Sequence, residues 1–344
     1  MKSMFPQLLT RRTAVSLFTG AAFALATTTL PATADIAIKD GQKLAFMGDS
    51  ITQGGWGNPG GYVRLVIAGL EANGIKTTPI PAGISGHKSD QMLARLKKDV
   101  LDKKPDFMTL SCGVNDVWHG ARGVLLDQYK VNITAIVDQC AAAGVKVVIL
   151  TATVIGEELG NDNNKKLAPY NEFLRSLAKE KNLPLADLYA MFEEVIKTKT
   201  KPGNAYTSDG VHMNAAGDQI MARGVLQALG LDAAQLKKAQ DAWLDLPNAA
   251  GFRARFDAGK GKAFQASARV SLRQMEKLKA DAAKTGKSVD EILNAAYAAD
   301  VKALLKPAGE YENAEAIFTA KKDKEVQAAL EKKFAAHVEA LLKK

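Results

Sequence analysis

Short apolar runs alternate with longer amphipathic runs over most of the first two thirds of this 344-residue sequence. Several short runs are almost continuously apolar, which is typical of parallel strands buried on both faces. The longer runs repeat apolar residues at helical spacing. This alternation predicts a doubly wound α/β fold, in which about five parallel strands are flanked by helices on both faces. The expected strands are Leu44–Met47, Thr78–Pro81, Phe107–Cys112, Val145–Thr151 and Leu183–Ala186.

The expected alternation of strands and helices indicates where in the chain the functional residues lie. In open α/β sheets, ligand sites form outside the carboxyl ends of the strands. The segments that follow Met47, Pro81 and Cys112 are therefore expected to share one crevice. The expected helices are Tyr62–Ala72, Ser89–Leu101, Leu125–Ala143, Lys165–Lys181 and Ala215–Leu229.

Residues 1–34 have the pattern of an export signal. Lys2, Arg11 and Arg12 precede an acid-free apolar run that ends at Leu30, and a small-x-small cleavage pattern closes the segment. The paired arginines suggest the twin-arginine route. A membrane anchor is the alternative, although threonines and a glycine dilute the run, and a spanning helix needs about 20 mostly apolar residues. The mature protein is therefore expected to be exported, to the periplasm or the extracellular space.

Charge is distributed unevenly and divides the chain. Residues 35–234 carry 22 Lys and Arg against 22 Asp and Glu, whereas residues 235–344 carry 21 against 15. A neutral first segment argues against nucleic acid as the partner of the predicted α/β domain. We expect a hydrolase domain over 35–234 and a mainly helical, basic C-terminal module over 235–344.

Only two cysteines occur, Cys112 at the end of an expected strand and Cys140 in an expected helix. Two buried thiols are favoured over a bridge between them, because exported proteins that depend on disulfides carry more cysteines. The fold is therefore expected to depend on its hydrophobic core.

Two motifs carry residues suited to acyl transfer. Gly48-Asp49-Ser50 follows the first expected strand, where a glycine permits a sharp turn that exposes the serine hydroxyl. Asp209-Gly210-Val211-His212 precedes the last expected helix, and a carboxylate three residues from a histidine can orient the ring. Taken alone, the first motif also suits a helix cap and the second is weak.

Two further motifs lie on the same side of the expected sheet. Gly83-Ile84-Ser85-Gly86 follows the second strand and can present bare backbone N–H groups. Gly113-Val114-Asn115-Asp116 follows the third strand, and the Asn115 amide can donate into the crevice. Each motif by itself could be a plain turn.

In order and spacing, the four motifs resemble the sequence blocks of the SGNH (GDSL-type) hydrolase superfamily, over roughly Leu44 to Leu229. The resemblance implies an SGNH/flavodoxin-like three-layer sandwich and a serine esterase that forms an acyl-enzyme without metal or other cofactor. It implies that Ser50 is the nucleophile, His212 the base and Asp209 its orienting acid. It also implies an oxyanion hole formed by the N–H groups of Ser50 and Gly86 and the side chain of Asn115.

The substrate is less constrained by the sequence. Asp49, Tyr62, Trp118 and His119 lie beside the blocks and are candidate substrate-binding residues, since aromatic side chains at a crevice can stack on sugar rings. Packing at the sheet edge is the alternative role for Trp118 and Tyr62. Exported relatives often deacetylate polysaccharides, so an acetylesterase acting on carbohydrate is favoured. A lysophospholipase or arylesterase is the second candidate, and a non-catalytic carbohydrate- or cell-wall-binding protein is the third.

The C-terminal module resembles the ribbon-helix-helix family weakly, over residues 266–305. An alternating stretch, Ala266–Leu272, precedes two expected helices that are separated by Gly286 and a capping box of Ser288 and Glu291. In that family the strand pairs with a twin across a homodimer and often contacts DNA. Export argues against nucleic acid, which leaves homodimerisation, binding of anionic polymers through the lysines, or packing on the hydrolase domain.

Overall fold

The computed structural model describes residues 36–200, 202–259, 262–305 and 320–343. The signal expected over residues 1–34 lies outside the described residues. Within the described residues, none of the helices combines the length and the apolar character that a membrane crossing requires.

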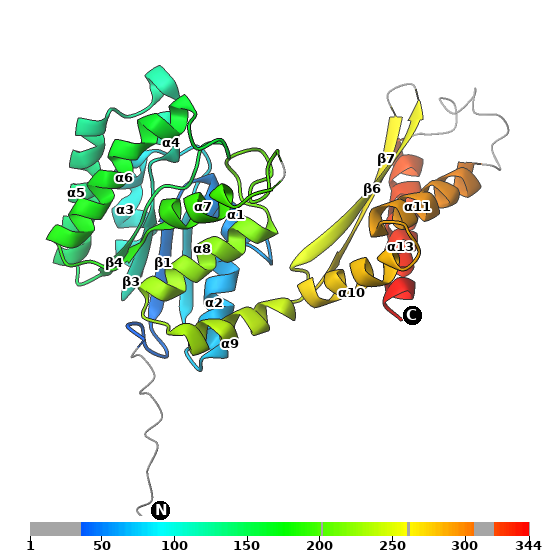
Figure 1. The fold of residues 1–344 in the computed structure, drawn as a ribbon, viewed down its shortest axis with the longest axis horizontal. Coiled ribbons are helices and arrows are strands. Elements are labelled where there is room, and N and C mark those ends of the chain that lie inside the picture. Colours follow the sequence, from blue (N-terminus) through cyan, green and yellow to red (C-terminus); the bar gives the residue numbers. More distant parts are fainter. Residues whose placement is uncertain (1–35, 201, 260–261, 306–319, 344) are drawn as a thin grey trace, which may run out of the picture. The chain divides into compact units, whose positions relative to one another are not determined.

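The first part of the chain forms a sheet of five parallel strands in the order β2-β1-β3-β4-β5 (Figure 1). The predicted doubly wound α/β fold is therefore confirmed. The strand order reverses between β1 and β3, and ligands of such sheets bind at this switch point. The strands are β1 (Lys43–Gly48), β2 (Thr78–Gly83), β3 (Phe107–Ser111), β4 (Lys146–Leu150) and β5 (Leu185–Ala186).

Helices cover both faces of the sheet. On one face α2 packs against α8 and α9, and on the other α5 packs against α3 and α6. Short α1 and α4 follow β1 and β3 directly and were not expected, because α1 contains three glycines and α4 has only five residues. The helices are α1 (Ser50–Gly57), α2 (Tyr62–Ala72), α3 (Ser89–Asp99), α4 (Val114–Trp118), α5 (Leu126–Ala142), α6 (Asp162–Glu180), α7 (Leu188–Lys197), α8 (Ala215–Ala228) and α9 (Ala233–Leu244).

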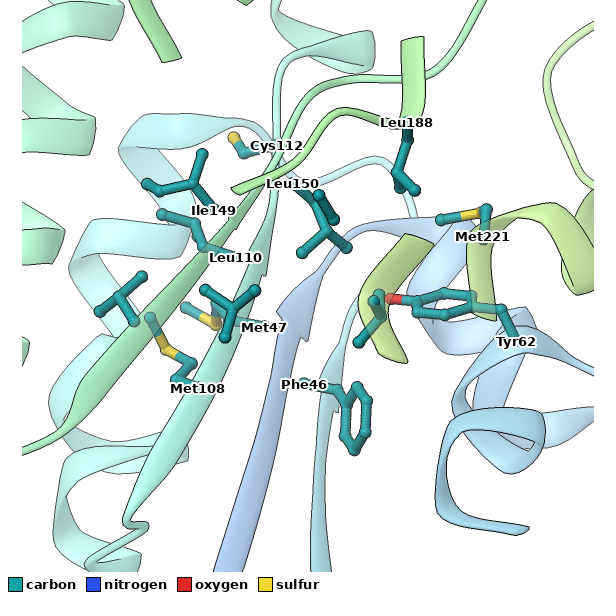
Figure 2. Packing of buried hydrophobic residues seen from close by; sticks show 14 of the residues in the cluster. Phe46, Met47, Tyr62, Met108, Leu110, Cys112, Ile149, Leu150, Leu188 and Met221 are labelled. Atoms are coloured by element: carbon teal, nitrogen blue, oxygen red, sulfur yellow. The ribbon is translucent and has the colours of Figure 1, made fainter. Parts of the chain in front are cut away.

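Alternate residues of each strand pack on opposite faces of the sheet. Phe46 points toward Tyr62 of α2, with the two rings edge to face and their centroids 6.5 Å apart, whereas Met47 packs on the other face beside Leu110 (Figure 2). Both strand residues are fully buried, which is why the sequence reads as continuously apolar there. Cys112 and Cys140 are buried free thiols, as the cysteine count predicted.

Helix α9 belongs to this first core. Its Trp243 is 1% exposed, and the indole Nε1 donates to the carbonyl of Leu65 at 2.8 Å. Leu236 and Ala239 are buried on the same helix face. The division expected after residue 234 falls inside this helix, and the first core continues to Trp243. Basic charge on the exposed face of α9 obscured this packing in the sequence.

The second body is a hairpin of β6 (Ala250–Gly259) and β7 (Lys262–Val270) with α10 (Leu272–Ala283), α11 (Val289–Leu305) and α13 (Ala320–Leu342). Its core shares no residue with the first core. The Ser288–Glu291 capping box is present, with the Glu291 N–H donating to Ser288 Oγ at 3.1 Å. β7 pairs antiparallel with β6 of the same chain, whereas in the ribbon-helix-helix family the partner strand belongs to a second copy. The alternating residues of β6 were the missed signal.

We predict that a chain ending after residue 249 keeps the full stability of the first body, whereas one ending after residue 234 loses several kcal/mol. Removing a buried tryptophan alone costs about 3–5 kcal/mol. Urea unfolding of residues 36–249 and 36–234 compares the two. Equal midpoints and slopes would show that α9 contributes nothing to the first core.

Candidate active site

Ser50, His212 and Asp209 form a hydrogen-bonded chain. The Ser50 Oγ lies 2.8 Å from His212 Nε2, and His212 Nδ1 lies 2.6 Å from Asp209 Oδ2. Asp209 Oδ1 accepts the backbone N–H groups of Val211 and His212 at 2.9 and 2.8 Å. Partial burial acts to raise the pKa of Asp209, but these hydrogen bonds outweigh it, and the pKa lies below its ordinary value. The ionised carboxylate therefore fixes the imidazole with Nε2 directed at the serine.

The nucleophile turn leaves no room for a side chain at two nearby glycines. A Cβ on Gly48 would lie 2.0 Å from the Thr52 Oγ1, and a Cβ on Gly83 would lie 2.3 Å from the backbone N of Gln53. Glycine at both positions lets β1 turn sharply into α1 while β2 runs beside that turn. Ser50 is thereby the first residue of α1, where its N–H has no partner within the helix.

Asp49 is not the substrate-binding residue that was predicted. It is 2% exposed, and its Oδ1 accepts the N–H of Ile51 at 2.9 Å as the cap of α1. Its Oδ2 accepts Asn115 Nδ2 at 3.2 Å. Burial raises the pKa of Asp49 to about 6, against the opposing effect of the Ile51 N–H. Asp49 therefore positions the nucleophile turn and Asn115 from the interior of the protein.

The three predicted oxyanion donors lie on segments that the structure ties together. Asn115 Nδ2 donates to Asp49 after β1 and also to the carbonyl of His87, at 3.2 Å, after β2. Gly86 lies in the turn that precedes His87, and the Ser85 N–H donates to Gln53 of α1 at 2.8 Å. An oxyanion would compete with Asp49 or His87 for an Asn115 N–H, and the oxyanion role of the three donors stays a prediction.

Asp116, the last residue of the Gly113-Val114-Asn115-Asp116 motif, has a structural role. Its Oδ1 accepts both the backbone N–H and the hydroxyl of Ser89, at 3.0 and 2.6 Å, which caps α3. Burial raises the pKa of Asp116 even though these bonds oppose it. The side chain therefore links the segment after β3 to the start of α3.

The other predicted substrate residues divide into two groups. Trp118 is 44% exposed, and its ring centroid lies 6.5 Å from that of His212, so it borders the triad. His119 follows it and is half-buried. Tyr62 is wrongly predicted, because it is fully buried and its hydroxyl hydrogen-bonds Thr52 Oγ1 at 2.8 Å.

Arg95 of α3 is a positioning residue that sequence reasoning missed. Its guanidinium donates to the carbonyls of Gly48 and Ala82 at 2.9 and 2.8 Å and to His87 Nδ1 at 3.1 Å. Its side chain is only 10% exposed. One planar cation therefore holds the ends of β1 and β2 together directly behind the serine. The available signal was a charged residue bordering the apolar face of α3.

Glu157, in the segment after β4, is a second missed residue. Its carboxylate accepts the backbone N–H groups of Ala205, Tyr206 and Thr207 at 2.8, 2.8 and 2.9 Å, together with the Thr207 hydroxyl and Lys199 Nζ. Burial acts to raise its pKa, but these donors outweigh burial and lower it. Glu157 therefore anchors the loop that carries Asp209 and His212. Nothing in its sequence neighbourhood marked this role.

Among the residues that the structure describes, no three His, Cys, Asp or Glu side chains gather where they could hold a metal ion. The arrangement present is a nucleophile, a base and an orienting acid, beside backbone and amide donors. Such a set can form and hydrolyse an ester of Ser50 by general acid–base catalysis.

Known proteins share this combination of fold and motifs. Residues 46–220 match the GDSL-like lipase/acylhydrolase family. The acetylxylan esterase of Geobacillus stearothermophilus is 30% identical over 216 residues, which is 57% of this chain and 97% of that protein. The crystal structure of that enzyme, Axe2, superposes with a TM-score of 0.52 at 29% identity, and the acetyl xylan esterase AlAXEase superposes with 0.51 at 33% identity, covering 54% of this chain and 98% of that one.

The chain therefore belongs to the GDSL-like lipase/acylhydrolase family, as its four motifs indicated. It is a hydrolase of carboxylic esters.

We predict that Arg95→Met lowers kcat for p-nitrophenyl acetate by roughly 10- to 100-fold with a smaller change in KM, because displacing a catalytic group by about 1 Å costs that much. Arg95→Lys should recover part of the loss. Lys98→Met, at an exposed position of α3, is the matched control. An Arg95→Met enzyme with normal kcat and only a lower melting temperature would contradict the positioning role.

We predict that Glu157→Gln destabilises the protein by about 1–3 kcal/mol at pH 7. The reason is that the NH2 group of glutamine would replace an acceptor oxygen and face buried N–H donors. The lowered pKa gives the sign of the pH dependence. The stabilisation by Glu157 is complete above its ordinary pKa of 4.5 and is lost as the pH falls through its lowered folded value. Urea unfolding from pH 7 to pH 3 measures the difference, which should shrink on acidification. The exposed neighbour Glu158→Gln should show no such difference at pH 7.

Proposed function

We propose that this protein removes acetyl groups from a polysaccharide, with xylan as the favoured backbone. The observation that carries the proposal is the Ser50–His212–Asp209 geometry, in a chain that an acetylxylan esterase matches over 97% of its own length. Catalytic mutants of that relative replace a serine, and an aspartate and a histidine three positions apart. Asp209 and His212 have the same spacing. The pattern over residues 1–34 supports export, so we expect the polymer outside the cytoplasm.

The reaction proceeds in two halves. His212 Nε2 takes the hydroxyl proton as the Ser50 Oγ attacks the acetyl carbonyl carbon, and the oxyanion forms beside the N–H groups of Ser50 and Gly86 and the amide of Asn115. His212 then protonates the departing sugar oxygen, which leaves acetyl-Ser50. Water attacks this ester with His212 again as the base, and acetate leaves as the proton returns to Ser50.

The position of Trp118 supports a sugar as the substrate. Its ring is exposed beside His212, and an exposed aromatic face can pack on the apolar face of a sugar ring while hydroxyl groups stay in water. A lysophospholipase or arylesterase is the alternative activity, for which the same triad would serve.

The test compares acetate release from acetylated xylan with hydrolysis of p-nitrophenyl esters from acetyl to dodecanoyl. We expect acetate release, a kcat/KM that falls as the acyl chain lengthens, and a loss of about 10⁴-fold or more in kcat for folded Ser50→Ala. Higher kcat/KM for long acyl chains without acetate release from xylan would instead favour the lipid-directed alternative. Full activity of folded Ser50→Ala would refute the mechanism.

A further inference from the structure

The β6–β7 hairpin has one buried and one exposed face. The hairpin lies beside α11 and α13 (Figure 1), and the residues of its buried face belong to the second core. They are Phe252, Ala254, Phe264, Ala266 and Val270. The alternate residues are all exposed, and we call them the ribbon face. The ribbon face consists of Gly251, Arg253, Arg255, Asp257, Ala263, Gln265, Ser267 and Arg269.

The basic residues of the ribbon face are of one type. Residues 250–344 contain 15 lysines and four arginines, yet the ribbon face carries three arginines and no lysine. Lysine suffices to keep a helix surface solvated. Arginine differs because its planar guanidinium donates two parallel hydrogen bonds to one carboxylate or phosphate.

The ribbon face carries more basic than acidic side chains. Among the described residues, neither Arg253 nor Arg255 forms an ion pair, whereas the helices of this body hold ion pairs such as Lys333–Asp300 at 3.1 Å. Asp257 is the single acidic residue of the ribbon face. Adjacent like charges on an exposed sheet create a potential that attracts an anionic partner.

The register gives each of these arginines a neutral hydrogen-bonding neighbour. Arg253 pairs with Ser267 and Arg255 with Gln265 across the two strands, and the two arginines are about 6.6 Å apart along β6. The same four residues border an open hollow of about 700 Å³, which Ala254 and Ala266 of the buried face and residues of α11 and α13 line as well. On the helix side the hollow is lined by Asn294, Gln327 and one acidic residue, Glu331.

We propose that the ribbon face binds a polysaccharide bearing carboxylate groups, such as uronic acid units, with Arg253 and Arg255 as the main contacts. Charge complementarity selects an anionic polymer, and the hydroxyl and amide neighbours suit sugar hydroxyls. The face has no aromatic residue on which bases could stack and no large apolar residue to enter a lipid surface. The binding of such a polysaccharide by the ribbon face does not depend on the proposed function. The role of that binding, which is to hold the polymer near the esterase, rests on the proposed function.

The test is affinity electrophoresis of the full-length protein in native gels that contain polygalacturonate, unsubstituted neutral xylan or double-stranded DNA. We expect retardation by polygalacturonate alone, reduced by added salt. Arg253→Gln/Arg255→Gln should weaken that binding at least about tenfold. Lys302→Gln/Lys332→Gln is the matched control, because it removes the same charge from exposed positions of α11 and α13. It should change binding less than about threefold.

Three results would overturn the proposal: no retardation by polygalacturonate, equal losses in the two double variants, or stronger retardation by DNA than by polygalacturonate. Hydrolysis of p-nitrophenyl acetate verifies that the first body of each variant is folded, and an unchanged far-UV circular dichroism spectrum verifies the same for the second body. Retardation that persists in a protein unable to release acetate from any polysaccharide would contradict the proposed function alone. Acetate release without retardation would contradict the ribbon face alone.

Discussion

β1 is hydrogen-bonded to β2 on one side and to β3 on the other, with Gly48 beside Gly83 and Met47 beside Leu110. Because all three strands are parallel and in this register, they end at one edge, and the segments that follow them lie side by side. The serine, the glycine turn and the asparagine amide enter the site from these three segments. The histidine arrives from a loop far along the chain. A shift of β1 by one residue would turn its buried side chains to the opposite face of the sheet and separate these groups.

Buried charged groups hold that edge in place. Arg95 donates hydrogen bonds to the ends of β1 and β2, and Asp49 links the nucleophile turn to Asn115. Glu157 accepts hydrogen bonds from the loop before Asp209. Each of these groups satisfies backbone or amide atoms that would otherwise be costly to bury. The triad itself consists of three side chains, but its geometry depends on this second set, none of which needs to touch substrate.

The two bodies of the chain differ in how they use charge. The first body is nearly neutral, and a few of its charged groups, among them Arg95, Asp49 and Glu157, lie inside at fixed hydrogen-bonding positions. The second body has a separate core and carries the basic excess on its surface. Within that surface, pleating sorts arginine onto one face of the hairpin and apolar residues onto the other. The chemistry of the ester bond and the proposed contact with a polymer therefore lie in different parts of one chain.

The sequence by itself determined the fold class, the five strands and the triad, because strand burial leaves continuous apolar runs and the motifs fall directly after those runs. The sequence also indicated that Trp118 lies beside the site, because it closely follows the Gly113–Asp116 motif in the chain. The tertiary structure alone decided the place of Tyr62 and Asp49 in the interior, the membership of α9 in the first core and the roles of Arg95 and Glu157. These depend on contacts between residues far apart in the chain, such as Trp243 with Leu65 and Glu157 with Tyr206. Local periodicity reports which side of an element is buried, but it does not report which partner lies there.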